Sequence, residues 1–226
     1  MLMDPRKEQL LQLVVENYID TAEPVGSKFL SENNGLQVSG ATIRNELRVL
    51  EEEGFLTHPH TSAGRIPTEA GYKFYVENIM KPKAINTKIK DTMDSLFHAS
   101  EESRKVKEIG KFVAEQGNNA VIIAINQDHI YYTGISNLFS QPEFRDFAHV
   151  AHVSNIFDQC EERIGDLYNL VDENTTILIG SNNPFGSACS LVVTRTKDGG
   201  LFALMGPIRM DYNKTFGLIN HIQTLF

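Results

Sequence analysis

The chain has 226 residues, of which 41% are hydrophobic, and this length and composition suit one or two globular domains and exclude a disordered or fibrous protein. Its formal net charge of −8 excludes a polybasic nucleic-acid coat. No stretch approaches the roughly eighteen apolar residues that span a bilayer, and residues 1–9 carry charges where a signal peptide is apolar, so we expect a cytoplasmic protein.

Two helices are predicted at the start of the chain. Asp4 is a good N-cap and Pro5 suits the first helical position, and an apolar stripe then extends to about Asp20. The stripe consists of Leu10, Leu13, Val14 and Tyr18. A short second helix is predicted from residues 24–27 onward, with Phe29 and Leu30 as core candidates.

A third helix, expected to begin after Ser39, has one apolar face and one polar face. Ser39 is a preferred N-cap residue and, with Thr42, a candidate DNA contact at the start of the helix. Ile43, Leu47 and Leu50 recur at the spacing that keeps one helical face apolar. At about 100° per residue the opposite face points away from the core. That face holds Ala41, Arg44, Asn45 and Arg48, with Thr42 at its flank.

These side-chain types are the ones that read base edges in the major groove of DNA. Arginine binds guanine O6 and N7 as a fork, asparagine does the same to adenine N6 and N7, and alanine or threonine meets a thymine methyl group. The solvated face of an ordinary surface helix has a similar pattern. The helix alone therefore leaves both interpretations open.

A small two-stranded sheet with a polar loop is predicted directly after this helix. Gly54 ends the helix, residues 55–57 start a strand, and Ile66-Pro67 closes the second strand. The loop, residues 58–65, has no apolar side chain larger than Ala or Pro, which suits contact with phosphate oxygens or a minor groove. An ordinary turn has the same composition. The candidate contacts are His60, Thr61, Ser62 and Arg65, together with Lys28 on the second helix.

Three helices followed by a two-stranded wing predict a winged helix-turn-helix domain, with the third helix in the major groove of DNA. Arg44, Arg48 and Arg65 gather where a duplex would lie, although the chain as a whole is acidic. Because the overall charge repels DNA, binding should depend on few contacts and weaken steeply with salt. The polar Lys81-Pro82-Lys83 segment predicts a boundary, so residues 1–83 are expected to form the DNA-binding domain.

The second domain, residues 84–226, is predicted to combine a sheet with several helices. Helical spacing continues to Ala114, and Asp211 is expected to cap the last helix. The expected strands are 120–125, 130–133, 175–179, 191–196 and 201–205, and the expected later helices are 143–155, 158–170 and 213–225. The fold class is therefore α+β, with a mixed, largely antiparallel sheet. Cys160 and Cys189 are too few for a disulfide scaffold and should be reduced core thiols.

The motif V-S-G-A-T-I-R-N-E-L and the later run H-P-H-T-S-A-G-R-I-P-T-E-A-G-Y-K-F-Y-V closely resemble the N-terminal domain of the HrcA family of heat-inducible transcription repressors. Blocks near the C-terminus, such as G-P-I-R-M-D-Y at residues 206–212, resemble the family's later part. The resemblance implies repression of chaperone operons through an inverted-repeat operator called CIRCE, a GAF-like second domain, and assistance by the chaperonin GroEL. This chain is shorter than is usual for the family and lacks most of an inserted dimerising domain, which puts the family's mode of dimerisation in doubt.

Neither an enzyme nor a cofactor or metal site is expected, because G-x-S-x-G, H-E-x-x-H and P-loop motifs are absent from the sequence. The polar run at residues 181–187 suits either a cradle for an anion or small effector, or an ordinary turn. His149 and His152 could share a metal ion with Cys160 or Asp146, although a surface helix with two histidines has the same spacing. Arg209 could bridge to the strand layer or to a partner subunit.

Two functions remain open from the sequence. The favoured one is a homodimeric repressor of heat-shock operons, because an inverted repeat is read by two helices related by a twofold axis. The second domain would then dimerise or regulate the protein. The alternative is a winged-helix regulator of other genes, controlled by a ligand or a protein bound to the GAF-like domain.

Overall fold

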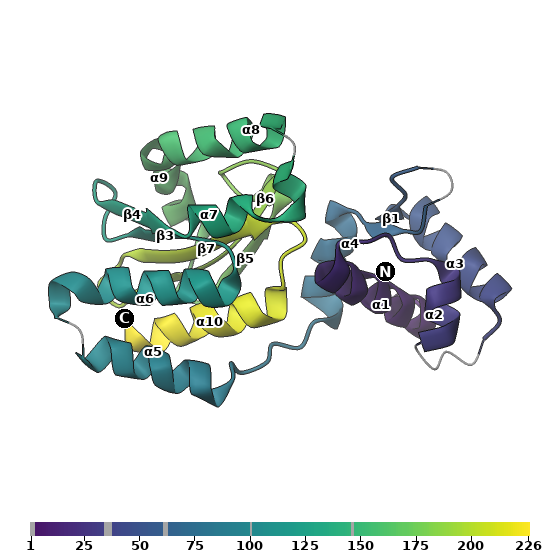
Figure 1. The fold of residues 1–226 in the computed structure, drawn as a ribbon, viewed down its shortest axis with the longest axis horizontal. Helices are drawn as coiled ribbons and strands as arrows, with labels where there is room; N and C mark the ends of the chain where they lie inside the picture. The colour runs from purple at the N-terminus through teal and green to yellow at the C-terminus, as the bar shows by residue number, and fades with distance from the viewer. Residues whose placement is uncertain (1–2, 34–37, 61–62, 100, 146) are drawn as a thin grey trace. The chain divides into compact units, whose positions relative to one another are not determined.

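The computed structural model describes residues 3–33, 38–60, 63–99, 101–145 and 147–226. They form two units, Met1–Lys81 and Pro82–Phe226 (Figure 1). The division lies beside the boundary that the sequence indicated after residue 83. Within the described residues, no helix combines the length and the apolar character needed to cross a membrane.

The first unit begins with three helices, α1 (Pro5–Thr21), α2 (Ser27–Asn33) and α3 (Gly40–Glu52). Asp4 caps α1 by accepting a hydrogen bond from the backbone N–H of Arg6, as its position before proline predicted. The buried stripe of α1 is Leu10, Leu11, Val14 and Val15, so Leu13 and Tyr18 lie at its margin. Leu30 of α2 is fully buried, whereas Phe29 is 40% exposed and the prediction that it belongs to the core is wrong.

A two-stranded antiparallel sheet follows, formed by β1 (Leu56–Thr57) and β2 (Ile66–Pro67). Gly54 has φ +84°, a left-handed conformation that favours glycine and ends α3 as expected. The unit closes with α4 (Glu69–Phe74) and a π-helical turn, η1 (Tyr75–Ile79). Three helices and a two-stranded wing therefore occur in the order that a winged helix-turn-helix requires.

The second unit is built on a five-stranded sheet in the order β4-β3-β7-β6-β5. The strands are β3 (Ala120–Ala124), β4 (Ile130–Thr133), β5 (Thr176–Ile179), β6 (Cys189–Arg195) and β7 (Leu201–Pro207). Every pairing is antiparallel, with Ile122 opposite Ala203 and Val192 opposite Leu204. The expectation of a largely antiparallel sheet is confirmed, and none of these five strands pairs in the parallel sense.

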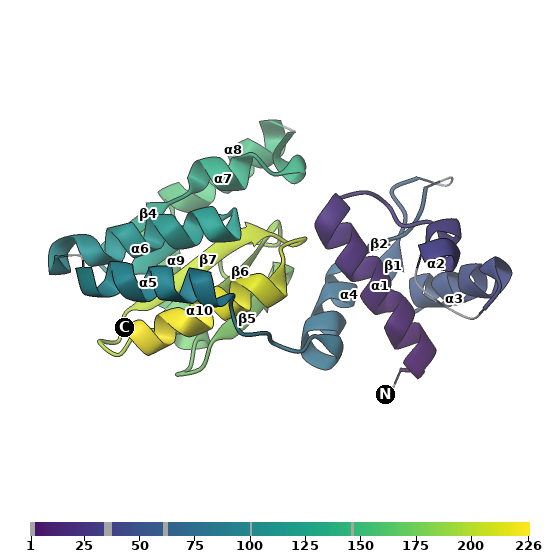
Figure 2. The ribbon, with the colours of Figure 1, turned by 60° about the horizontal axis from the view of Figure 1, so that its bottom comes forward.

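Helices cover both faces of this sheet (Figure 1, Figure 2). On one face lie α6 (Glu102–Gly117) and α10 (Tyr212–Leu225), with α5 (Thr87–Ala99) packed against them. The other face is covered by α7 (Ile135–Phe139), the 3₁₀ turn η2 (Pro142–Arg145), α8 (Phe147–Asp158) and α9 (Cys160–Leu170). Because both faces are covered, β3 and β7 consist entirely of buried residues. Asp211 caps α10 by accepting from the backbone N–H of Lys214, which confirms the prediction.

Candidate nucleic-acid interface

The third helix presents the two faces that its sequence predicted. Ile43, Leu47 and Leu50 are buried against the rest of the unit. Ala41, Arg44, Asn45 and Arg48 are exposed. The apolar spacing therefore fixes the orientation of α3, and four side chains of the DNA-reading types share its outer face.

The start of α3 is held by its own cap. Ser39 Oγ accepts a hydrogen bond from the backbone N–H of Thr42 at 3.1 Å and lies 3.0 Å from Thr42 Oγ1. Ser39 is exposed and Thr42 is half-buried. Both residues were predicted to touch DNA, and in this structure their side-chain oxygens contact each other as part of the cap.

The cations of the outer face differ in how they are paired. Arg48 Nη1 lies 2.5 Å from Glu52 Oε1, four residues along the helix, in an exposed ion pair. Among the described residues, no side chain pairs with the guanidinium of Arg44 or the amide of Asn45. With respect to the described residues, the hydrogen-bonding groups of both side chains are therefore available to a base edge.

The wing loop, residues 58–65, is tied to the segment that precedes α2. The backbone N–H of Arg65 donates to the carbonyl of Val25 and the N–H of Val25 donates to the carbonyl of Arg65, each at 2.9 Å. Gly64 makes this approach possible, because a Cβ there would lie 2.5 Å from the carbonyl carbon of Val25. The sequence did not predict this bridge, which adds a third strand-like segment to the wing.

One carboxylate, that of Glu51, contacts both ends of the wing loop. Its Oε2 lies 2.7 Å from Arg65 Nη2, and its Oε1 contacts His58 Nδ1. The side chains of Glu51 and Arg65 are each 22% exposed. Arg65, predicted as a DNA contact, is thus already in an ion pair, and its buried Nε has no hydrogen-bond partner among the described residues.

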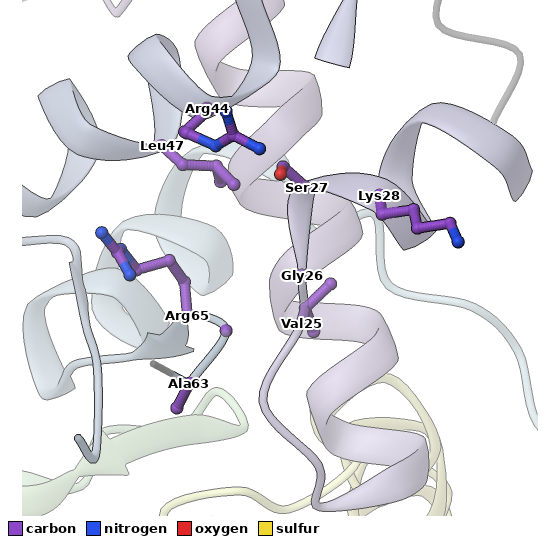
Figure 3. A pocket seen from close by; sticks show the side chains of 9 residues that line it. Val25, Gly26, Ser27, Lys28, Arg44, Leu47, Ala63 and Arg65 are labelled. Carbon is purple, nitrogen blue, oxygen red and sulfur yellow. The ribbon is translucent and has the colours of Figure 1, made fainter. Parts of the chain in front are cut away.

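Three of the predicted cations, Lys28, Arg44 and Arg65, line one open pocket of about 380 Å³ between α2, α3 and the wing (Figure 3). Leu47 of α3 and Ser27, the first residue of α2, also line it. Lys28 is 86% exposed, with Nζ 3.9 Å from Glu32 Oε1. A positively lined hollow beside an exposed reading face is suited to an anionic polymer.

The remaining predicted wing contacts are divided between described and undescribed residues. His60 is exposed, and its carbonyl accepts a hydrogen bond from the N–H of Ala63 at 2.9 Å. Thr61 and Ser62 lie outside the described residues. Glu51 was not predicted to take part, because its partners are seven and fourteen residues away and no local pattern joins them.

In the polar run at residues 181–187 of the second unit, the side chain of Asn183 forms its hydrogen bonds within the chain. Asn183 is 5% exposed, and its Nδ2 donates to the carbonyls of Gly180, Gly186 and Cys189 at 2.9, 3.0 and 2.6 Å. Its Oδ1 accepts from the N–H of Phe185, whose side chain is fully buried. The geometry therefore favours the ordinary-turn interpretation over an effector cradle.

No group of three metal-ligating side chains occurs among the residues described. Asp146 and the side chains of His149 and His152 lie outside that set. Cys160 and Cys189 are free, buried thiols, and burial raises the pKa of Cys160 to about 11 and that of Cys189 to about 12.

Arg209, one of the residues whose role the sequence left open, is tied to a neighbouring turn of the same unit. Its Nε lies 2.5 Å from Glu143 Oε1, and its Nη2 lies 3.3 Å from Glu143 Oε2. Arg209 thus bridges from the chain after β7 to η2.

The chain is similar to known proteins over both of its units. A family model described as "HrcA protein C terminal domain" matches residues 74–216. The "Heat-inducible transcription repressor HrcA" of Acetivibrio thermocellus is 35% identical over 188 residues, which cover 70% of this chain and 52% of that relative. The protein of the same name from Brevibacillus brevis is 23% identical, over 98% of this chain and 96% of the relative.

The chain thus spans about half the length of the first of these relatives. The alignment with the second has 329 positions, which 226 residues cannot fill, so part of that relative has no counterpart here. A crystal structure of a hypothetical protein shares the fold, with a TM-score of 0.76 and 16% identity over 99% of this chain and 97% of the other. From the family model and these relatives, we conclude that the chain belongs to the HrcA family.

Proposed function

We propose that this chain is a transcription repressor of heat-shock genes that binds an inverted-repeat operator of the CIRCE type as a homodimer. The observation that carries the proposal is the outer face of α3, where Arg44 and Asn45 are exposed and no described residue pairs with their side chains. The names of the relatives, heat-inducible transcription repressors, support the same function.

In this proposal, the residues divide into base-reading and backbone-holding groups. Arg44, Asn45 and Arg48, with Ala41 and Thr42, meet base edges in the major groove. Lys28, Arg65 and the wing residues His60, Thr61 and Ser62 contact phosphates or the minor groove, and Ser39 holds the start of the helix. The positively lined pocket beside Arg44 supports this division, because a duplex following α3 would bring its backbone there.

The proposal also assigns roles to a partner chain and to the second unit. Two copies of α3 are needed to read the two halves of an inverted repeat, and the second unit joins the two chains. The chaperonin GroEL is the further partner, raising the fraction of active repressor. We place no small-molecule ligand in the polar run at residues 181–187, since the polar groups of Asn183 are already satisfied within the chain.

Fluorescence polarisation with labelled duplexes tests the base-reading role. The intact chain is titrated against a CIRCE-type repeat, against a scrambled duplex of equal composition, and against a single half-repeat, at two salt concentrations. Arg44→Ala and Asn45→Ala should each cost roughly 1–3 kcal/mol of binding to the repeat, with a smaller loss on the scrambled duplex. The dimer should bind the full repeat more tightly than the half-repeat, because only the full repeat engages both copies of α3.

Arg104→Ala serves as the matched control, because Arg104 is an exposed arginine in the second unit, on α6. This variant removes the same charge without changing any residue of α3. Equal losses on the repeat and the scrambled duplex for Arg44→Ala and Asn45→Ala would refute the base-reading role. A titration with added GroEL should raise the active fraction without changing the affinity of each active dimer.

A further inference from the structure

We propose that Glu51 is a specificity-determining positioning residue that holds the wing loop in place and keeps the guanidinium of Arg65 away from non-matching DNA. The inference rests on the proposed function, since it concerns how the same interface discriminates between duplexes. Glu51 itself touches no DNA in this proposal. It acts through His58 and Arg65, the two residues that its carboxylate contacts.

The carboxylate closes the base of the wing loop. Glu51 lies in the last turn of α3, His58 directly follows β1, and Arg65 directly precedes β2. Each oxygen of the carboxylate therefore contacts a different end of the loop, Oε1 at His58 and Oε2 at Arg65. A single side chain thereby fixes the spacing between the two ends of the wing and the end of the helix that reads the bases.

Arg65 is held from two directions at once. Its backbone is paired with Val25 through two hydrogen bonds of 2.9 Å, and its guanidinium is paired with Glu51 at 2.7 Å. Both partners of the ion pair are mostly shielded from solvent, so water and salt screen the interaction less than they screen the exposed pair of Arg48 and Glu52. The loop end at Arg65 is thus preorganised by contacts within the first unit.

The same carboxylate competes with phosphate for the guanidinium of Arg65. Guanidinium groups bind carboxylate and phosphate oxygens in the same way, so Arg65 contributes less to sequence-independent attraction while Glu51 occupies it. On a matched operator a preorganised wing avoids the cost of ordering the loop during binding. Loss of the negative charge should therefore change the affinities for matched and non-matched DNA in opposite directions.

Glu51→Gln is the test, with Glu53→Gln as its control. Glu53 is two residues away and pairs with Lys7 Nζ at 2.7 Å, with no contact to the wing among the described residues. Both variants remove one negative charge at the end of α3. Polarisation titrations against the CIRCE-type repeat and the scrambled duplex give the ratio of the two affinities for each variant.

Glu51→Gln should bind the scrambled duplex more tightly and the repeat more weakly, so that the ratio falls by about tenfold. Glu53→Gln should strengthen binding to both duplexes by the same factor and leave the ratio unchanged. A ratio for Glu51→Gln equal to that of Glu53→Gln overturns this inference alone. If the unaltered chain fails to discriminate between the duplexes, the proposed function falls, and this inference with it.

Hydrogen exchange on the free protein tests, without DNA, whether the carboxylate of Glu51 holds the wing loop in place. The amides of Ala63 and Arg65, which donate to His60 and Val25, should exchange faster in Glu51→Gln than in Glu53→Gln. The core amides of α1 should exchange at the same rate in both variants, which shows that the unit remains folded. Equal exchange rates of the Ala63 and Arg65 amides in the two variants would contradict the role of Glu51 in holding the wing loop.

Discussion

The wing loop of the first unit and the loop between β5 and β6 of the second, residues 180–188, are rich in the same residue types. Each combines glycine, proline and serine with a side chain that both donates and accepts hydrogen bonds, His60 in one and Asn183 in the other. In the β5–β6 loop, Asn183 is 5% exposed and Phe185 is fully buried, whereas His60 is exposed.

The contrast shows that the composition of a polar loop indicates a turn but not its use. What distinguishes the two loops is where their hydrogen-bonding groups find partners. Asn183 satisfies its amide on carbonyls of its own loop and of Cys189, so that loop stabilises the fold. The wing loop is fixed at its ends by Glu51 and Val25, which leaves a side chain such as His60 exposed and available to a partner.

The largest expected effect is the loss of the buried aromatic ring of the β5–β6 loop. Phe185→Ala should lower the free energy of unfolding of the second unit by about 3–5 kcal/mol, because it leaves a cavity in the core. Urea denaturation followed by circular dichroism measures the change. Leu170→Ala is the control in the same unit, since that side chain is 49% exposed, and it should cost far less. Similar losses for the two variants would contradict a structural role for the β5–β6 loop.

Asn183→Ala should cost about 2–3 kcal/mol, since three carbonyls lose the donor that satisfies them. Reaction of the Cys189 thiol with an aromatic disulfide, in a Cys160→Ala background, provides a local measurement. Burial raises the pKa of Cys189 to about 12, so at pH 8 the thiolate is scarce and the intact loop should react slowly. Asn183→Ala should speed the reaction, and replacement of the exposed neighbour Asn182 should not.

At the base of the wing, Gly64→Ala should lower the stability of the first unit by about 2 kcal/mol, because the new Cβ would lie 2.5 Å from the backbone of Val25. Gly26→Ala is a matched control beside the same bridge, where a Cβ would meet nothing within 4 Å. That change should be neutral or slightly stabilising. Equal thermal midpoints for the two variants would mean that the wing is not held to Val25.

The smallest effect on stability is expected at the exposed part of the wing. His60→Ala should change the free energy of unfolding by no more than about 0.5 kcal/mol, because the side chain is exposed and the hydrogen bond to Ala63 uses only the backbone carbonyl. Its effect should appear in DNA binding, as a similar weakening on matched and scrambled duplexes. A loss of stability comparable to that of Asn183→Ala would remove the distinction between the loops.

Local patterns in the sequence were sufficient to predict the helix that carries the candidate site. Ser39 at the cap and the spacing of Ile43, Leu47 and Leu50 are determined within one helix, and the structure confirms each of them. The four strands that form the two hairpins of the second unit were predicted in the same way, from short apolar runs. Periodicity and capping act over a few residues, which is why the sequence alone reveals them.

Contacts between distant residues were not predictable in this way. The pairing of Arg65 with Glu51 and with Val25 joins residues far apart in the sequence, and an arginine in a polar loop gives no local sign of being engaged. Phe29 was wrongly assigned to the core for a related reason. The seven residues of α2 form too short an apolar stripe to show which face of that helix is buried. The short helix α7 was missed since its five residues show no helical periodicity.

The order of strands in the second unit also determines when the sheet can be completed during synthesis. β3 and β4 form a hairpin early, but the other neighbour of β3 is β7, and Ala120 pairs with Met205. During synthesis on the ribosome, the edge of β3 that will pair with β7 therefore stays unpaired until all the residues between β3 and β7 have been made. An open edge of this kind is a template for strands of other chains, so we expect mispairing between nascent molecules to begin there.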